Sequence, residues 1–425
     1  MANESTEEPS GQEVPKDKIV IDYKGQKGRA AHERKQLKKD AETVESVERM
    51  AILQRGILST SRFSAANLQP TRLCLTSSSL DNVSFAYASG RQVVEAHVTL
   101  GLTEDERDKV TLGTQGINIS NIVAMKPIES TPLVSNPVHH AEIQSIARKD
   151  NLVASVDTKG AAVVYTKSSN SNHIGDGESE SRKKQRVEAS FSSHVLSNST
   201  TAEISWAGVA FDPTATQAVT AHSLTKALRF YDYTTGQLTH SQTALMSPTA
   251  LAYSSSSSLV VAEYNQMSVW DGKSHERIAR EGLPSLGSIY SVAWSPDGNS
   301  IAIGGEDKIA YIYDTRKWKL RSLWRCPLKY DLAFLVFSPT DPTLCYVAGL
   351  DNELMCGKYE GKKQKSNEPK QYSPSILQMN HRLGFRGDSR WIGLDVLGQD
   401  GQDMALGICE GGSAYAVAPA QHMVG

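Results

Sequence analysis

The residue types that carry enzymatic or metal chemistry occur in this sequence, but not at spacings that would bring them together. Five scattered cysteines form no Cys-x-x-Cys pair, and no His-x-x-x-His occurs, so no zinc site of a known pattern is indicated. The adjacent His139 and His140 cannot easily converge on one ion. Gly304 and Gly305 lie between two expected strands with no helix behind them, which argues against a nucleotide-binding loop. We expect no metal and no cofactor.

Carboxylates that could act as general acids or bases lie in expected turns between strands. Asp157, Glu306 and Asp307 are of this kind, and turn carboxylates usually bond to the backbone around them. Neither a Walker phosphate loop nor a Gly-x-Ser-x-Gly nucleophile turn is present. The prediction is a protein that is not an enzyme and has no small-molecule substrate.

The overall composition is that of an ordinary globular protein. The 425 residues are 39% hydrophobic and 22% charged, and the formal net charge of −2 gives no overall field that would attract nucleic acid or an anionic membrane. An odd number of cysteines argues against a disulfide framework, and no apolar stretch is long enough to cross a membrane. Residues 1–12 lack the apolar core of a secretion signal. We expect a nuclear or cytoplasmic location, or both, and no membrane association.

A repeat of about forty residues organises most of the chain. Aromatic residues that end a short apolar strand recur at intervals of 42, 41, 43 and 48 residues, at Phe211, Tyr253, Trp294, Phe337 and Phe385. Strands that end in an aromatic residue and an aspartate lie between them, at Tyr231-Asp232, Trp270-Asp271 and Tyr313-Asp314. Several short strands in each such period are typical of a four-stranded propeller blade.

The clearest unit, Ile289 to Lys317, reads IYSVAWSPDGNSIAIGGEDKIAYIYDTRK and resembles the WD-repeat family. The resemblance covers about residues 71–419 and implies an all-β fold, a seven-bladed β-propeller of four-stranded antiparallel blades. The expected blades span about 71–100, 140–166, 204–238, 248–276, 289–318, 331–360 and 379–419.

The chain departs from the family pattern in two respects. The Trp-Asp pair is complete only at Trp270-Asp271, and the Gly-His dipeptide that usually opens a repeat is absent. The buried His-Ser/Thr-Asp-Trp network of the family is therefore expected to be partial at best. His140 is interpreted as the histidine that opens the second blade.

In this family an N-terminal strand commonly completes the last blade and so removes an open sheet edge. The strand expected at Ala414 to Ala418 is the third of its blade, and too few residues follow it for a fourth. ILSTSRF at 57–63 is the expected closing strand, and KIVIDY at 18–23 is the alternative.

The segments outside the blades differ from them in composition. Residues 1–29 are expected to form a disordered basic tail, and 30–56 an amphipathic helix with apolar residues at three- and four-residue intervals. The propeller is expected to span residues 57–425. Within it, 101–137 is expected to be a loop with one extra strand, and the Ser- and Asn-rich stretch 167–203 a disordered loop.

Two basic clusters offer partner hypotheses. The first, at 24–39, could contact RNA phosphates or an acidic partner, or could be the solvated face of a helix, which we favour because no aromatic residues interleave the charges. The second, Arg182, Lys183, Lys184 and Arg186, fits a nuclear import signal, although short basic runs are common by chance.

One motif points to a named class of partner. Residues 301–316, IAIGGEDKIAYIYDTR, resemble the box by which some WD-repeat proteins bind the damaged-DNA-binding adaptor of cullin–RING ubiquitin ligases. The matching residues are Asp307, Tyr313, Asp314 and Arg316, which makes them candidate protein-binding residues. A cation after Trp-Asp is also frequent in WD repeats that never meet this adaptor. The leading prediction is a non-catalytic protein-interaction scaffold within a larger complex, with a ubiquitin-ligase substrate receptor and a nuclear RNA-processing or ribosome-assembly factor as alternatives.

Overall fold

The computed structural model describes residues 50–58, 68–76, 82–99, 123–126, 128–167, 191–284, 287–359, 381–399 and 401–420. All of them belong to the unit Arg49–Gly425. Their regular elements are β-strands, and no helix long and apolar enough to span a membrane occurs in these ranges. The basic tail, most of the expected N-terminal helix and the alternative closing strand at 18–23 lie outside the described residues.

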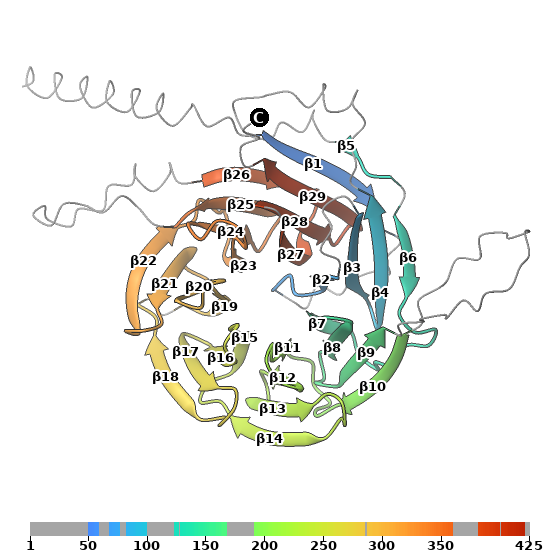
Figure 1. Ribbon diagram of the computed structural model, residues 1–425, viewed down its shortest axis with the longest axis vertical. Helices are drawn as coiled ribbons and strands as arrows, with labels where there is room; N and C mark the ends of the chain where they lie inside the picture. The colour runs from blue at the N-terminus through green and yellow to red at the C-terminus, as the bar shows by residue number, and fades with distance from the viewer. Residues whose placement is uncertain are drawn as a thin grey trace, which may run out of the picture. The chain divides into compact units, whose positions relative to one another are not determined.

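The strands form seven sheets, which are the blades of a β-propeller around a central axis (Figure 1). Blade 1 consists of β2 (Leu73–Leu75), β3 (Asn82–Ser89), β4 (Gln92–Thr99) and β6 (Glu129–Pro132). Blade 2 consists of β7 (Ile143–Lys149), β8 (Leu152–Asp157), β9 (Ala162–Lys167) and β10 (Phe191–Ser197). Blade 3 consists of β11 (Ala207–Phe211), β12 (Gln217–His222), β13 (Ala227–Asp232) and β14 (Leu238–Thr243).

Blades 4 to 6 repeat this arrangement of four consecutive antiparallel strands. Blade 4 consists of β15 (Pro248–Tyr253), β16 (Ser258–Glu263), β17 (Gln266–Asp271) and β18 (Arg277–Gly282). Blade 5 consists of β19 (Ile289–Trp294), β20 (Ser300–Gly305), β21 (Ile309–Asp314) and β22 (Lys319–Arg325). Blade 6 consists of β23 (Leu332–Phe337), β24 (Leu344–Gly349), β25 (Glu353–Lys358) and β26 (His381–Arg386).

Blade 7 joins the two ends of the chain. It consists of β27 (Trp391–Gln399), β28 (Gln402–Cys409), β29 (Ser413–Ala420), β1 (Met50–Ile57) and β5 (Val123–Ala124). Strand β1 pairs antiparallel with β29 along its whole length, and β5 adds a short parallel strand to the outer edge of β1. The expected seven-bladed ring and its closure by an N-terminal strand are both present in the structure.

The core lies between the blades, which explains the apolar runs in the middle strands. In β16, Leu259 and Val261 face the cluster between blades 3 and 4, whereas Val260 and Ala262 face the cluster between blades 4 and 5. All four are fully buried. A strand covered on both faces needs apolar residues at consecutive positions, whereas an outer strand such as β14, LTHSQT, can be polar.

The closing strand differs from the expected one. Strand β1 occupies Met50–Ile57, so the expected strand at 57–63 overlaps it only at Ile57, and the helix expected over 30–56 cannot include residues 50–56. Residues 59–63 lie outside the described part of the chain. The helical spacing of apolar residues expresses only a local preference. Pairing over eight residue pairs satisfies the backbone groups at the edge of β29, and this pairing outweighs the local preference.

The blade boundaries also differ from expectation. The expected blades at 204–238, 248–276 and 289–318 end at or before the first residue of their fourth strands, β14, β18 and β22. Three other outer strands lie further from their expected places. Strand β26, which includes Phe385, is the fourth strand of blade 6, whereas the sequence pattern placed Phe385 in blade 7. The expected loops at 101–137 and 167–203 contain β6 and β10, the fourth strands of blades 1 and 2. Long segments precede all three strands in the sequence, so the forty-residue period is lost just where the outermost strand returns to its blade.

Candidate protein-interaction surfaces

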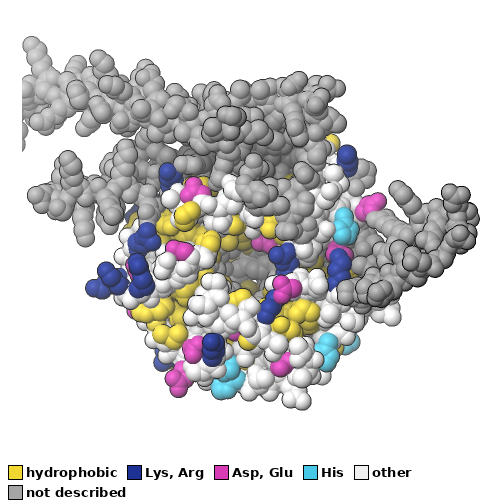
Figure 2. Space-filling view, in the orientation of Figure 1, with side chains coloured by type: hydrophobic (Ala, Val, Ile, Leu, Met, Phe, Trp, Pro, Cys, Tyr) yellow, Lys and Arg dark blue, Asp and Glu magenta, His cyan; other side chains and the backbone are white. Residues whose placement is uncertain are grey.

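The ring has two faces with different connections. We name as the loop face the one formed by the turns between the second and third strands of each blade and by the connections between blades. The turn face, opposite, is formed by the turns between first and second and between third and fourth strands. Figure 2 shows one face of the ring, where apolar patches surround the central opening among charged side chains of both signs.

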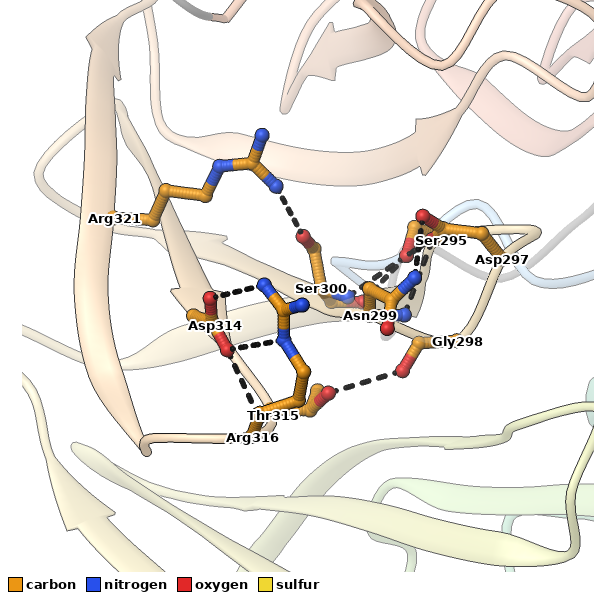
Figure 3. Close-up of polar contacts among 9 residues, drawn as sticks. All are labelled: Ser295, Asp297, Gly298, Asn299, Ser300, Asp314, Thr315, Arg316 and Arg321. Atoms are coloured by element: carbon orange, nitrogen blue, oxygen red, sulfur yellow. Dashed lines mark hydrogen bonds and ion pairs between the residues drawn. The ribbon is translucent and has the colours of Figure 1, made fainter.

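The Asp314 and Arg316 pair lies on the turn face, just after β21 (Figure 3). The Arg316 guanidinium donates from Nε to Asp314 Oδ1 at 3.3 Å and from Nη2 to Oδ2 at 2.9 Å, and the Arg316 backbone N–H donates to Oδ1 at 2.9 Å. These bonds lower the pKa of Asp314 to about 2. The Arg316 side chain remains 68% exposed.

A neighbouring turn holds this pair in place. The Ser300 backbone N–H donates to Ser295 Oγ at 2.9 Å, and Gly298 adopts a φ of 69°, which favours glycine in the turn. Thr315 Oγ1 then donates to the carbonyl of Gly298 at 3.0 Å. The two side-chain bonds to Asp314 use two of the five guanidinium N–H donors, so Arg316 can still bind a carboxylate from a partner.

The other two residues of the proposed box do not join this pair. Asp307 lies before β21, at the opposite end of that strand, where it accepts hydrogen bonds from Tyr311 Oη at 2.6 Å and from the Ile309 backbone N–H at 3.1 Å. Along an extended strand this places Asp307 roughly 20 Å from Asp314. Tyr313 is buried between blades 4 and 5. Of the candidate residues, only Asp314 and Arg316 share one exposed rim.

The histidine that opens blade 2 is His139, not His140 as the sequence suggested. His139 is buried, with Nε2 at 2.6 Å from Ser155 Oγ and Nδ1 at 3.3 Å from Asp157 Oδ2, whereas His140 is exposed. Tyr165 hydrogen-bonds with the same Ser155, and burial raises the pKa of Tyr165 to about 12. A four-member network is thus complete in blade 2, with tyrosine as its aromatic member.

Asp157 is charged at the centre of this network. Burial by itself raises the pKa of Asp157, but the bonds from His139 and from the backbone N–H groups of Ala161 and Lys159 outweigh it and lower the pKa. The role of Asp157 in the fold is therefore structural. Glu306 likewise accepts from the Ser288 backbone N–H, at 2.9 Å.

A group of exposed apolar side chains on the loop face was not foreseen from the sequence. Its members lie in turns of blades 3 and 4 and in the connections between blades 2 and 3, 3 and 4, and 5 and 6. They are each 44–64% exposed: Ile204, Leu224, Leu245, Tyr264 and Tyr330. Large apolar side chains exposed on one face mark a candidate binding surface. The available signal was an apolar residue inside a turn, as with Leu224 and Tyr264, but single exposed apolar residues are too common to be informative.

The chain positions these side chains rigidly. Ser205 Oγ accepts from the Leu224 backbone N–H at 3.3 Å, which joins the connection into blade 3 to a turn of the same blade. The buried Glu263 carboxylate accepts from the backbone N–H groups of Leu245 at 2.8 Å and Met246 at 3.1 Å. Tyr264, next in the chain, donates its own N–H to the Ser247 carbonyl at 3.1 Å. Leu245 and Tyr264 therefore project from one hydrogen-bonded unit.

A cavity of about 290 Å³ is lined mainly by the innermost strands of blades 3 to 6, and also by Thr71, Ser145 and Asp395. Trp206, Tyr290 and Trp294 form part of its wall, and Gln69 reaches across the ring to donate from Nε2 to the Thr249 carbonyl at 3.0 Å. Its volume is at the lower limit of ligand pockets. No group of three potential metal-ligating side chains occurs among the described residues.

No protein-family model and no curated protein matches the sequence. The fold is that of a seven-bladed propeller, a rigid ring that commonly serves to bind partner proteins. The candidate import signal, Arg182, Lys183, Lys184 and Arg186, and the basic cluster at 24–39 lie outside the described residues.

Proposed function

We propose that this protein is a divergent WD-repeat scaffold without catalytic activity, which binds a partner protein through its loop face as part of a larger complex. The observation that carries the proposal is the group of apolar side chains Ile204, Leu224, Leu245, Tyr264 and Tyr330. Aromatic and large aliphatic side chains held on a rigid frame lose little conformational entropy on binding, and they dominate the energy of protein interfaces.

The surroundings of this group also suit a protein partner. Charges of both signs flank it, among them Glu306 and Lys308 in the corresponding turn of blade 5. Burial, followed by the nearby charge of Glu306, raises the pKa of Asp331. An apolar centre with a charged, partly hydrated rim is the usual arrangement of a protein interface.

The test compares two variants with matched loss of apolar surface. The loop-face variant carries Leu224→Ser and Leu245→Ser, and the control carries Leu238→Ser and Ile278→Ser, which are exposed residues at the turn-face end of outer strands. Affinity purification with quantitative mass spectrometry should recover the same partners with the wild type and the control but lose them with the loop-face variant. Equal recovery by all three proteins would contradict the proposal.

A second candidate function is that of substrate receptor for a cullin–RING ubiquitin ligase. The exposed and aligned guanidinium of Arg316 favours it, because such a fork can bind a carboxylate of an adaptor in two places. Arg316→Ala should abolish capture of the damaged-DNA-binding adaptor, and Lys317→Ala, next to it, should not. Undiminished capture by Arg316→Ala, or none by the wild type, would exclude this function. RNA binding and nuclear import stay predictions.

A further inference from the structure

We propose that the outer edge of β22 binds an extended acidic segment of a partner protein, which pairs with it as an added strand of blade 5. The proposal concerns the circumference of the ring and does not depend on the loop face. It rests on the charges of β22, on its free edge and on a pairing that the chain itself makes in another blade.

The first observation is the charge of blade 5 at its outer strand. The cations Lys317, Lys319, Arg321 and Arg325 are all exposed. No aspartate or glutamate occurs between Thr315 and Tyr330 in the sequence, and the carboxylate just before, Asp314, is already paired with Arg316. This leaves a local excess of positive charge over the length of one strand.

The outer strands of the other blades do not share this excess. Strands β10 and β14 contain no lysine, arginine, aspartate or glutamate, and β18 contains two arginines and one glutamate. In β26 one of two arginines, Arg386, is paired with Glu353 at 2.6 Å. Protection of an open edge by charge would apply to every blade, so it does not account for a charge concentrated on one.

The second observation is that β22 is the last strand of its sheet in the described part of the chain. Its register with β21 is regular from Ser322↔Ile312 to Arg325↔Ile309, whereas Arg321 lies in a bulge. Figure 3 shows Arg321 directed away from Asp314, with Nη1 at 3.2 Å from Ser300 Oγ. The four residues from Ser322 to Arg325 are thus extended and able to accept a further strand.

Blade 7 shows that an outer edge of this ring can accept one. Strand β5 pairs in parallel with β1, with Gln54 opposite Val123 and Arg55 opposite Ala124. The Met125 backbone N–H donates to the Arg55 carbonyl at 2.8 Å. In this blade the added strand comes from the chain itself and is only two residues long, so four residues of β22 are enough for a similar contact.

The same features favour an acidic polypeptide over a nucleic acid. Phosphates could contact these cations, but a nucleic acid cannot pair with a strand edge, and β22 offers no exposed aromatic ring on which bases could stack. Trp324 within β22 is buried, and Trp318 packs against the cluster between blades 4 and 5. The cations repel a basic strand and attract an acidic one, and they act little on a neutral strand. They therefore select among possible strands by charge.

The test uses the full-length protein and a fluorescent peptide of roughly eight residues that alternates glutamate with valine. Two further peptides carry N-methyl groups on alternate residues, the first peptide along one edge of the strand and the second along the other. Each peptide thus lacks the backbone N–H donors of one edge and keeps its charge. A thymidine oligonucleotide of similar length is the competing polyanion. Binding is measured by fluorescence anisotropy, and backbone protection by hydrogen exchange.

Two charge-reversal variants locate the site. One carries Lys319→Glu, Arg321→Glu and Arg325→Glu; the control carries Arg91→Glu, Lys126→Glu and Lys273→Glu, three exposed cations elsewhere that give the same change in net charge. The first variant should weaken peptide binding roughly tenfold or more, and the control should leave it within about twofold. Methylation of one peptide edge, but not of the other, should weaken binding to the wild type to a similar extent.

Hydrogen exchange should show slowed exchange at Ser322–Arg325 when the peptide is bound. The proposal is wrong if the peptide gives no protection there, if both methylated peptides bind like the parent, or if the two variants weaken binding equally. The proposal is also wrong if the oligonucleotide binds better than the peptide and the variant with Lys319→Glu, Arg321→Glu and Arg325→Glu loses that binding. The surface would then be a nucleic-acid site. The exchange and methylation results come from the wild type, so they decide the matter even if a variant fails to fold.

Discussion

Two adjacent histidines before the first strand of blade 2 differ in burial and in their contacts. His139 and His140 are adjacent, yet only His139 turns inward to Ser155 and Asp157. Both partners are fully buried, and His139 makes one of the hydrogen bonds of each. A buried network of this kind stabilises the blade only while all its members are present.

His139→Ala should lower the free energy of unfolding by about 1–3 kcal/mol, because it removes one hydrogen-bond partner from buried Ser155 and one from the buried, charged Asp157. His140→Ala, at an exposed position, should change it by less than about 0.5 kcal/mol. Urea unfolding followed by intrinsic fluorescence measures both. Similar losses in the two variants would show that the network carries no special stability.

A second histidine makes stability depend on pH. Burial, the largest effect, lowers the pKa of His222 below 6.5, its value without perturbation. The unfolded chain then binds this proton more readily than the folded ring, so stability is lost as pH falls below 6.5. The melting temperature should therefore be lower at about pH 5.5 than at about pH 7.5, and His222→Gln should reduce that difference. An unchanged pH dependence in this variant would assign the effect to other groups.

At the scale of strands, the join between blades 7 and 1 depends on a close approach of two backbones. Thr71, just before β2, forms a bridge with Gly393 of β27, and the Arg72 backbone N–H donates to the Ile392 carbonyl at 3.1 Å. The buried Arg72 side chain also pairs with Glu142 at 2.7 Å, which joins blade 1 to the connection into blade 2. The segment before β2 thus holds three blades together.

Gly393→Ala should destabilise this join. An added Cβ would lie 2.5 Å from Leu73 Cβ and 3.0 Å from the Leu73 backbone nitrogen, which cannot move aside without shifting β2. The expected loss is about 1–3 kcal/mol, as for other overpacked sites. Gly282→Ala is the control, because no atom lies within 4 Å of its added Cβ. Chemical denaturation of both variants measures the difference, and equal stabilities would show that the join tolerates a side chain.

At the scale of the whole molecule, a closed ring leaves no blade without two neighbours. Strand β1 pairs with β29 along its whole length, and Arg55 of β1 pairs with Asp388 at 2.7 Å. Because each blade buries its core against the next, opening the ring at blade 7 exposes apolar surface on both sides of the break.

Two truncations test the closure. A protein that begins at Arg49 keeps β1 and should melt in one cooperative transition close to that of the intact chain. A protein that begins at Leu58 lacks β1 and should melt at lower temperature with a broader transition, because the edge of β29 is then unpaired. Calorimetry measures both, and identical melting of the two proteins would mean that β1 does not close the ring.

The sequence by itself determined the all-β class, the seven blades, the place of the first three strands of blades 3 to 5 and the need for an N-terminal closing strand. These follow from apolar periodicity and from turns such as Pro296-Asp297-Gly298, which are local properties. The structure alone decided that β1 closes the ring, that His139 is the buried histidine, and that Asp307 lies far from Asp314. It also brought Leu224, Leu245 and Tyr264 to one face, because the place of each blade depends on apolar packing against its neighbours, which no local pattern records.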